Sequence, residues 1–275
     1  MKSTSDLQVK DLGGVELGTQ LCSYDERDVM LYALAIGAGA TELDLVYEKQ
    51  LRVLPTFCLT LGLWAVWAAG ALGAYDPALT LHVGQELRMR GDVPANGKME
   101  TTASIGSVWD KGSAALVEVN VSSEVFEAMY TIFIPGAGNF GGERGQRAAG
   151  NFPEGPADVL GSFETSVDQP ALYRLTGDRH PVHIDPGAAI ASGFVRPIMH
   201  GLCTLGSSIL EIARRSGIDP TSLQQLTARL SAPVYPGATV NVEAWKSADD
   251  FYFSASDDSG VAAISGTGRF TELGL

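Results

Sequence analysis

The residues best suited to acid–base chemistry lie close together in the second half of the 275-residue chain. They occupy two segments, YRLTGDRHPVHIDP (173–186) and GFVRPIMHGLCTLG (193–206), which hold three of the four histidines. Asp178 and His183 are separated by a turn that contains Pro181. An aspartate and a histidine across such a turn can hold a water molecule between carboxylate and imidazole, which is what acid–base hydration needs. This pair is therefore a candidate for catalysis.

Two other interpretations of the cluster stay open on residue types alone. Asp178 could cap the turn, and His183 could be a buried histidine with satisfied hydrogen bonds. His180, His183 and Asp185 are also residue types that bind metals, but their spacing is unfamiliar and the prolines between them restrict convergence. We expect no metal ion and no cofactor at this cluster.

The segment GAGNFG (136–141) has the G-x-G-x-x-G spacing of a dinucleotide-binding loop. That fingerprint needs a helix that begins at the glycines and presents its amides to pyrophosphate. Here GERGQRAAGNFPEGP follows, and its glycines and prolines predict a loop, so we interpret 135–156 as a linker. Arg144 and Arg147 in this loop are candidates for contact with ligand phosphates, with plain solvent exposure as the alternative.

Similar segments indicate that one structural unit occurs twice. LPTFCLTLG (54–62) matches IMHGLCTLG (198–206) at an offset of 144, and Gly97 and Gly237 in later segments differ by 140. In each unit an apolar helix precedes runs that partly alternate apolar and polar residues, as half-buried strands do. The predicted fold class is α+β, with one helix in each unit buried against an antiparallel sheet.

The stretch 57–75 carries no charge and is long enough to span a membrane. A helix that is apolar on all sides can equally be a core helix wrapped by a sheet. We favour the core helix, because the segment has a counterpart in the second unit and nothing else in the chain resembles a membrane protein.

Composition and charge exclude several classes of protein. With 45% hydrophobic and 19% charged residues, disorder is not expected, and a net charge of −13 opposes binding to nucleic acid. The three cysteines, at positions 22, 58 and 203, suggest neither a disulfide framework nor a zinc knuckle. The start of the chain lacks the apolar run of a secretion signal, so we expect a cytoplasmic protein that is not bound to membranes.

The two cluster segments resemble the signature of the MaoC-like (R)-specific enoyl-CoA hydratases, which include the hydratase part of the peroxisomal multifunctional enzyme. YDERDVMLYALAIGAGATELDLVYEKQLRVLPTF (24–57) resembles the same family. The resemblance implies a double hot-dog fold, with a catalytically silent unit over 1–145 that forms the acyl-chain pocket. The second unit, over 155–275, carries the hydratase motif. The catalytic Asp and His of the family correspond to Asp178 and His183.

The implied reaction is hydration of a trans-2-enoyl-CoA to a (3R)-3-hydroxyacyl-CoA in the breakdown of fatty acids or steroid side chains. The thioester carbonyl is expected at the start of a helix near His200, where the backbone N–H of Gly201 would stabilise an enolate. His200 itself is expected to shape the loop. His180 stands where the family usually has Asn, and an imidazole can also hold the loop by hydrogen bonds.

The first unit lacks an equivalent of the G-D-x-x-P-x-H motif, so we expect it to serve binding. Trp64, Trp67 and the small residues at 68–71 are predicted to line an acyl-chain pocket, with ordinary core packing as the alternative. Three other functions stay open: a thioesterase of the same fold, a dehydratase working in the reverse direction in acyl-chain synthesis, and a non-enzymatic acyl-CoA-binding protein. The expected partner is an acyl-CoA substrate, and a homodimer is possible.

Overall fold

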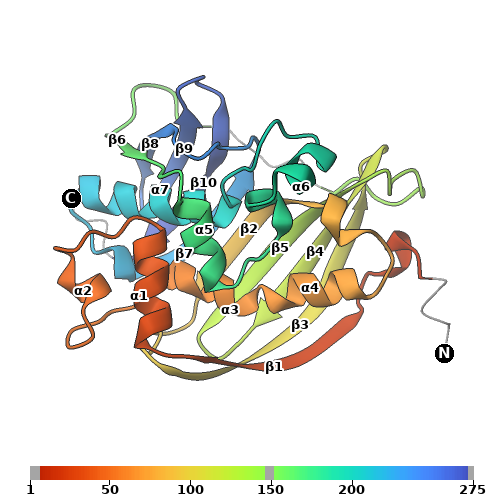
Figure 1. Cartoon of the computed structure of the whole chain (residues 1–275), viewed down its shortest axis with the longest axis horizontal. Helices are drawn as coiled ribbons and strands as arrows, with labels where there is room; N and C mark the ends of the chain where they lie inside the picture. Colours follow the sequence, from red (N-terminus) through yellow and green to blue (C-terminus); the bar gives the residue numbers. More distant parts are fainter. Residues whose placement is uncertain (1–6, 146–151, 272–275) are drawn as a thin grey trace.

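One antiparallel sheet runs through the described chain (Figure 1). The computed structural model describes residues 7–145 and 152–271. Within these residues the strands lie in the order β1-β3-β4-β5-β2-β7-β10-β9-β8-β6. Their bounds are β1 (Glu16–Tyr24), β2 (Leu81–Met89), β3 (Gly97–Asp110), β4 (Ala114–Ser122), β5 (Phe126–Pro135), β6 (Val159–Glu164), β7 (Leu223–Leu230), β8 (Thr239–Ser247), β9 (Asp250–Asp257) and β10 (Ala262–Phe270).

The two halves of the sheet meet where β2 lies beside β7. Five residue pairs, from Gly84–Arg229 to Arg88–Gln225, join these strands. Counted outward from this junction, the first half has the order β2-β5-β4-β3-β1 and the second β7-β10-β9-β8-β6. Corresponding strands therefore take corresponding places, as expected if one unit occurs twice. The predicted α+β class is confirmed.

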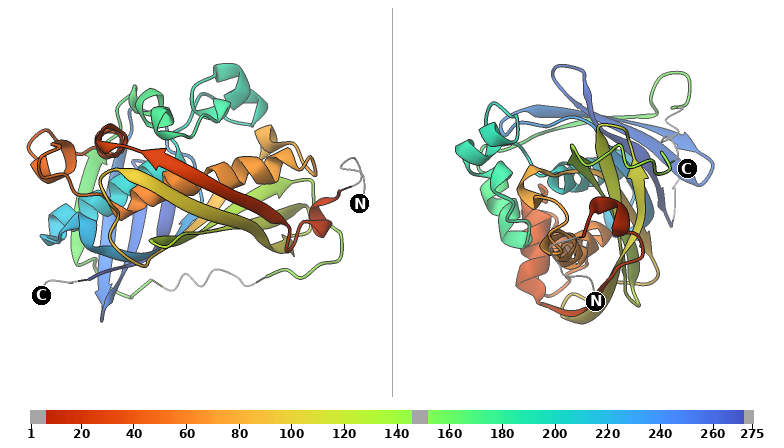
Figure 2. Two further views of the ribbon diagram at one scale, coloured as in Figure 1. Left: turned by 90° about the horizontal axis from the view of Figure 1, so that it is seen from below. Right: turned by 90° about the vertical axis from the view of Figure 1, so that its right-hand side faces the viewer.

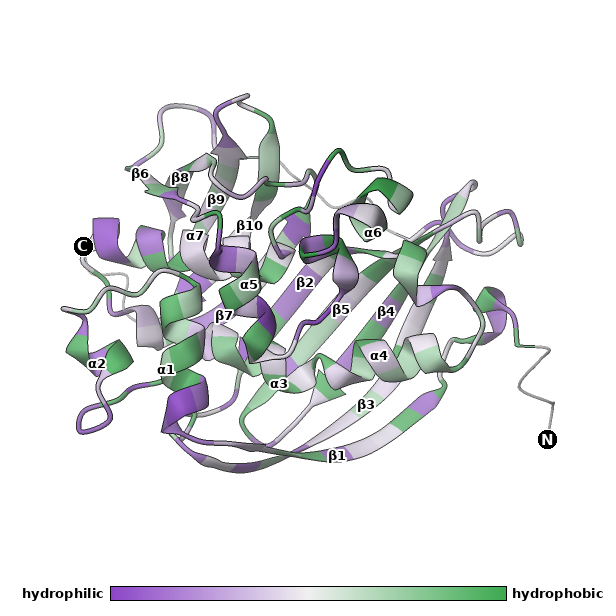
Figure 3. Cartoon of the chain, in the orientation of Figure 1, coloured by the Kyte–Doolittle hydropathy of each residue, from purple (hydrophilic) through white to green (hydrophobic). Residues whose placement is uncertain are grey.

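Each half packs its part of the sheet against one apolar helical segment. In the second half this is α7 (Gly201–Ser216), in which every residue from Leu202 to Ala213 is buried. In the first half it is α3 (Cys58–Gly62), continued by α4 (Trp64–Ala71). Seen along the long axis, the strands of the first half curve around these helices (Figure 2). Hydrophobic residues, green in Figure 3, recur along α4 and the neighbouring strands.

Shorter helices connect these elements. The α-helices are α1 (Glu26–Ala35), α2 (Leu43–Val46), α5 (Gln169–Tyr173) and α6 (Pro186–Ala191). The 3-10 helices are η2 (Val9–Asp11), η3 (Pro55–Phe57), η4 (Pro77–Leu79), η5 (Arg174–Thr176), η6 (Pro181–His183) and η7 (Pro220–Ser222).

The single helix predicted for the first half is divided at Leu63. The hydroxyl of Tyr130, on β5, donates to the carbonyl of Leu59 at 2.7 Å. In an unbroken helix that carbonyl would accept the N–H of Leu63, which bonds instead to the carbonyl of Thr60 at 3.4 Å. A Cβ on Gly62 would lie 2.5 Å from the hydroxyl oxygen of Tyr130, so only glycine lets helix and strand approach this closely.

The uncharged stretch 57–75 begins in the core of the first half, as predicted. Phe57, Cys58 and Leu59 are almost wholly buried. Within the described residues, no helix is both long and apolar enough to cross a membrane. The three cysteines are free and buried, which agrees with the expectation that they form no disulfide framework.

The pairing of β2 with β7 predicts that the second half depends on the first. Expressed alone, residues 155–275 are expected to aggregate, because one edge of β7 would be left with unpaired N–H and C=O groups. Size-exclusion chromatography and thermal unfolding measure this, with the full chain as control. A monomeric fragment that unfolds cooperatively near the transition temperature of the full chain would contradict the prediction.

Candidate active site

A cavity of about 220 Å³ lies where the two halves meet. The first half lines it with residues of α4, η4 and β2, and the second half with residues 178–183, the start of α7 and the end of β7. Asp178, His180 and His183 face this cavity, as does His82. Much of the remaining wall is apolar and includes Leu63, Val66, Ile132, Phe194, Met199 and Leu230.

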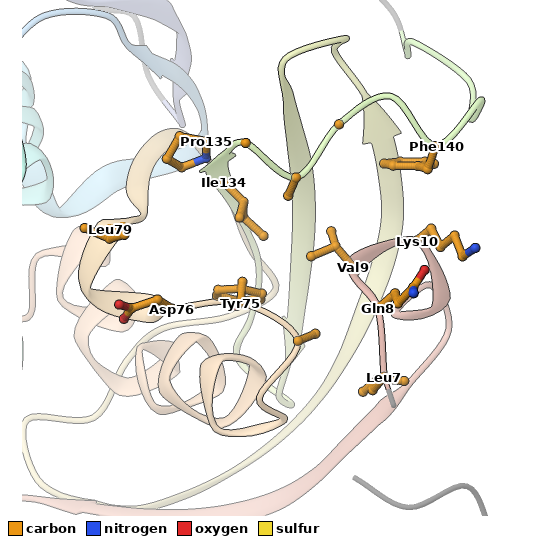
Figure 4. A pocket seen from close by; sticks show the side chains of 14 residues that line it. Leu7, Gln8, Val9, Lys10, Tyr75, Asp76, Leu79, Ile134, Pro135 and Phe140 are labelled. Carbon is orange, nitrogen blue, oxygen red and sulfur yellow. The ribbon is translucent and has the colours of Figure 1, made fainter. Parts of the chain in front are cut away.

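A second, wider hollow of about 460 Å³ lies at the far end of the first half (Figure 4). Its wall comes from η2, from the turn at 74–79 and from the end of β5 with the first glycines of GAGNFG. Asp178 and the four histidines are absent from its lining. No helix follows these glycines within the described residues up to 145, as predicted for a linker. The candidate chemistry is therefore confined to the first cavity.

The turn that carries Asp178 is shaped by its own backbone. Gly177 ends η5 with a φ of 130°, a conformation that is strained for residues other than glycine. The carboxylate of Asp178 then accepts the N–H of His180 at 3.1 Å. Pro181 begins η6, and this turn brings a ring nitrogen of His183 within 4.8 Å of a carboxylate oxygen of Asp178.

A hydrogen bond to the backbone fixes the tautomer of His183. Nδ1 of His183 lies 2.9 Å from the carbonyl oxygen of Ile198. Because a carbonyl oxygen can only accept, Nδ1 carries the proton and Nε2 keeps its lone pair. Asp178 and His183 therefore present an unprotonated oxygen and an unprotonated nitrogen to the same space.

His200 contacts both Asp178 and His183 but does not line the cavity. It is fully buried at the N-cap of α7, and its Nε2–H donates to the backbone carbonyl of Asp178 at 3.1 Å. Its ring stacks on that of His183, with centroids 3.8 Å apart, and Tyr173 packs beside it with a centroid distance of 4.9 Å. His200 thus holds both the backbone of Asp178 and the plane of the His183 ring.

Burial sets the charge states of the cluster. It lowers the pKa of His200 to about 3, and the neighbouring His183 adds to this effect. Burial also lowers the pKa of His183, although Asp178 opposes the shift. Burial alone would raise the pKa of Asp178, but the two histidines and the N–H of His180 outweigh it, so that pKa is lowered. At neutral pH a carboxylate therefore faces two neutral imidazoles.

His180 connects the cluster to the first half of the chain. Its Nε2 lies 3.4 Å from the carbonyl oxygen of Pro77, and its Nδ1 accepts the N–H of Val182 at 3.3 Å. Its ring also stacks on that of Trp67, with centroids 6.2 Å apart. The imidazole thus holds the loop by hydrogen bonds, which is the role expected of the Asn that the resemblance places here.

The start of α7 is open to the cavity at Gly201. The first N–H groups of a helix have no partner within the helix and can bind an anionic oxygen. A Cβ at Gly201 would lie 2.1 Å from Cδ2 of Leu230, which also lines the cavity. A larger residue would displace Leu230, so glycine keeps the helix start in close contact with the end of β7.

The structure brings Trp67 to the cavity but not Trp64. Nε1 of Trp64 donates to the hydroxyl of Thr101, on β3, at 2.8 Å, and neither Trp64 nor the small residues at 68–71 line the cavity. Leu63, Val66 and Trp67 face the cavity, and the opposite face of α4 packs on the sheet, so of the positions predicted to line a pocket Trp67 is the one beside this cavity.

Arg144, one of the two arginines proposed for phosphate binding, does not line the cavity. Arg144 is exposed, and its guanidinium lies close to Gly112 in the β3–β4 turn, outside the cavity lining. Arg147 falls outside the described residues.

The metal set weighed from the sequence, His180 with His183 and Asp185, does not assemble. The carboxylate of Asp185 accepts the N–H of Gly187 at 2.7 Å and that of Ala188, and so caps α6.

Sequence reasoning missed His82, which reaches the cavity from β2. A β-bulge between His82 and Gly84 alters the strand here, and Nε2 of His82 donates to the carbonyl of Gly84 at 2.8 Å. Burial lowers the pKa of His82 to about 4. The only sequence signal was a histidine within the run LTLHVGQEL, and no local spacing connects it to Asp178.

Two family descriptions match most of the chain. Residues 22–136 match the MFE-2 hydratase 2 N-terminal domain, and residues 150–263 match the MaoC-like domain. The chain belongs to the MaoC-like hydratase family.

Two relatives of this MaoC-like chain cover most of it. A Mycobacterium tuberculosis protein named 3-hydroxyacyl-thioester dehydratase Y is 35% identical over 82% of this chain and 83% of its own length. A Dictyostelium discoideum protein named probable enoyl-CoA hydratase 2 is 36% identical over 80% of this chain and 81% of its own length.

Solved structures support the same assignment of the MaoC-like chain. The full-length peroxisomal multifunctional enzyme type 2 of Drosophila melanogaster is 31% identical, with a TM-score of 0.80, over 92% of this chain and 48% of the other. This chain therefore spans about half the length of that enzyme. A Mycobacterium tuberculosis protein described as having a double hot-dog fold matches 97% of each chain, with a TM-score of 0.57 and 13% identity. The double hot-dog fold expected from the resemblance is confirmed.

The lowered pKa of His82 predicts how stability changes with pH in this MaoC-like chain. Between the ordinary histidine pKa near 6.5 and about 4, the unfolded chain binds a proton at His82 that the folded chain excludes. The free energy of unfolding should therefore fall as the pH falls through this window, by up to about 1.4 kcal/mol per pH unit for this group.

Urea unfolding at pH 7.5, 6 and 5 measures this dependence. His82→Gln keeps a side-chain donor for the carbonyl of Gly84 but cannot be protonated, so its free energy of unfolding should fall less steeply than that of the parent chain. Equal slopes for the two chains would show that His82 is protonated to the same extent in the folded and unfolded states.

Proposed function

We propose that the chain adds water across the double bond of a trans-2-enoyl thioester, with Asp178 and His183 as the acid–base pair. One observation carries the proposal: the carboxylate and the unprotonated Nε2 face one cavity beside the start of α7. The names of the relatives, an enoyl-CoA hydratase and a 3-hydroxyacyl-thioester dehydratase, describe the two directions of this reaction.

The proposed mechanism uses groups already in place. The water held by Asp178 and His183 gives a proton to this pair as its oxygen bonds to Cβ of the enoyl group. The electrons of the double bond move toward the thioester carbonyl, whose oxygen becomes an enolate beside the N–H of Gly201. The pair then returns a proton to Cα, so the elements of water are added and the protein is unchanged. No metal ion or cofactor takes part in these steps.

We propose an acyl-CoA as the substrate and the breakdown of fatty acids or steroid side chains as the setting. The apolar wall of the cavity supports an acyl group, and the implied product is the (3R)-hydroxyacyl thioester. For location we retain the reducing cytoplasm, which free buried cysteines support, although the Drosophila relative is named as peroxisomal. Arg144 and Arg147 remain our candidates for the phosphates of coenzyme A.

Substitution of the pair tests the reaction. Asp178→Asn and His183→Gln should each lower kcat for crotonyl-CoA hydration by about 10²–10⁴, because each removes an acceptor for the proton of water. Loss of the enone absorbance measures hydration, and release of free thiol in the same samples would reveal a thioesterase.

Asp168→Asn provides a matched control, because it neutralises an exposed carboxylate of the same half. This variant should retain the parent kcat. Wild-type turnover in folded Asp178→Asn or His183→Gln, or thiol release without hydration in the parent chain, would reject the proposed reaction.

The cavity wall also predicts substrate size. Val66 and Trp67 lie on the part of α4 that lines the cavity, so kcat/KM should rise from crotonyl-CoA to medium, long or ring-bearing esters. Val66→Phe should lower kcat/KM for the large esters more than for crotonyl-CoA, since such a clash discriminates by about 1–3 kcal/mol.

Ala71→Phe adds the same ring at an exposed position of α4 outside the cavity lining. It should leave the ratio between large and small substrates unchanged. Equal effects of Val66→Phe on both substrates, or a parent enzyme that prefers the four-carbon ester, would show that α4 does not bound the acyl site.

A further inference from the structure

Arg196 lies at the rim of the cavity, between residues that line it. Phe194 and Ile198 line the cavity on either side of Arg196 in the chain, and Arg196 itself is exposed. The N–H of Met199 donates to the carbonyl of Val234 at 2.8 Å, and both of these residues also line the cavity. The segment that carries Arg196 therefore runs beside the segment that follows β7, and its exposed side chain lies where the cavity wall meets the protein surface.

Two contacts hold the guanidinium of Arg196 in place. Its Nη1 donates to the carbonyl of Pro236 at 3.1 Å, and its Cζ lies 4.8 Å from the centroid of the Tyr235 ring. Tyr235 packs in turn on a small apolar cluster, of which Val182 and Ile198 line the cavity. An arginine stacked on an aromatic ring presents its remaining N–H groups in a fixed plane, so it loses less conformational freedom when an anion binds.

No carboxylate of the described residues forms an ion pair with this guanidinium. The ion pairs found across 7–145 and 152–271 use other arginines, namely Arg52, Arg90, Arg214, Arg215 and Arg269. The chain has a net charge of −13, so an anionic ligand depends on an uncompensated cation close to its binding site. The free N–H groups of arginine suit a phosphate, whose oxygens accept two parallel hydrogen bonds from one guanidinium.

Coenzyme A has to extend from the thioester to the protein surface. In the proposed reaction the thioester carbonyl lies beside Gly201 and the acyl group beside α4, so the rest of the substrate leaves the cavity past other parts of its wall. Arg196 precedes Gly201 by five residues, which span at most about 17 Å. The pantetheine arm, which joins the thioester sulfur to the first phosphate, is of comparable length. A phosphate at the end of that arm is therefore within reach of Arg196.

We propose that Arg196 binds the phosphate at the end of the pantetheine arm of the acyl-CoA substrate. Its guanidinium, stacked on Tyr235, donates to the phosphate oxygens at the rim while the acyl group occupies the cavity. Arg196 therefore serves substrate binding and takes no part in the chemical step. The inference rests on the proposed function for the identity of the substrate, and it adds a phosphate contact to those proposed for Arg144 and Arg147.

Hydration of crotonyl thioesters with and without phosphates tests the contact. Arg196→Gln should raise KM for crotonyl-CoA at least about threefold and leave kcat unchanged, because it removes a charged donor to the phosphate. KM for crotonyl-pantetheine, which has no phosphate, should stay at the parent value. Crotonyl-phosphopantetheine carries only the first phosphate, and its KM should respond to the substitution as that of crotonyl-CoA does.

Arg229→Gln is the matched control. Arg229 is exposed on β7 next to Leu230, which lines the cavity, and successive residues of a strand face opposite sides of the sheet. The variant removes the same charge on the other side of the sheet, so it should keep the parent KM for all three esters. Arg196→Lys retains the charge without the paired N–H groups, and its KM for crotonyl-CoA should lie between those of the parent and Arg196→Gln. Circular dichroism establishes that the variants are folded.

Calorimetric titration with coenzyme A and with pantetheine measures the same contact without turnover. The parent chain should bind coenzyme A more tightly than pantetheine, and Arg196→Gln should weaken the binding of coenzyme A alone. The contact is refuted by equal parent affinities for the two ligands, by a parent-like KM for crotonyl-CoA in folded Arg196→Gln, or by an equal rise in KM for crotonyl-pantetheine. A KM for crotonyl-phosphopantetheine that does not respond would overturn the assignment to the first phosphate.

The titration also separates this contact from the proposed reaction. A chain that binds coenzyme A through Arg196 but hydrates no enoyl thioester would refute the proposed function alone and leave the phosphate contact intact. A chain that hydrates crotonyl-CoA equally well with and without Arg196 would refute the contact and leave the proposed function intact.

Discussion

The pairing of β2 with β7 is the interaction on which the cavity depends. Its five residue pairs turn two sheets into one, and they place His82, from the first half, in the same cavity as Leu230, from the second. Neither half encloses the cavity by itself, because its walls come from both. The apolar contacts of α4 and the hydrogen-bonded turn at Asp178 face each other only while this junction holds.

Hydrogen bonds to backbone carbonyls determine which ring nitrogens of the cavity histidines keep a lone pair. The backbone carbonyl of Ile198 accepts the ring N–H of His183. In the same way the carbonyl of Asp178 accepts the N–H of His200, and that of Gly84 accepts the N–H of His82. Burial then lowers the pKa of each of these imidazoles, so they stay neutral and keep one lone pair. Geometry and desolvation therefore act together: the first selects the tautomer, and the second keeps the ring from taking up a second proton.

The sequence could predict contacts between residues that lie close together along the chain. Asp178 and His183 stand five residues apart, and a single proline turn brings them together, so their convergence was predictable. Trp64 and Trp67 are both apolar and close in sequence, and which of them faces the cavity depends on where the helix is broken. That break comes from Tyr130, which lies far along the chain on β5. His82 was missed for the same reason, because only the order of strands in the sheet brings it near Asp178.

The contacts of His180 have a consequence for how such proteins evolve. Its ring rests on Trp67 and its Nε2 bonds to the carbonyl of Pro77, both in the half without the motif. An asparagine here offers a shorter side chain and no ring to stack, so a change between the two residues alters the contact surface that faces position 67. Among relatives, the identities of positions 67 and 180 are expected to covary, so that a residue in the half without the motif changes together with a residue in the half that carries it.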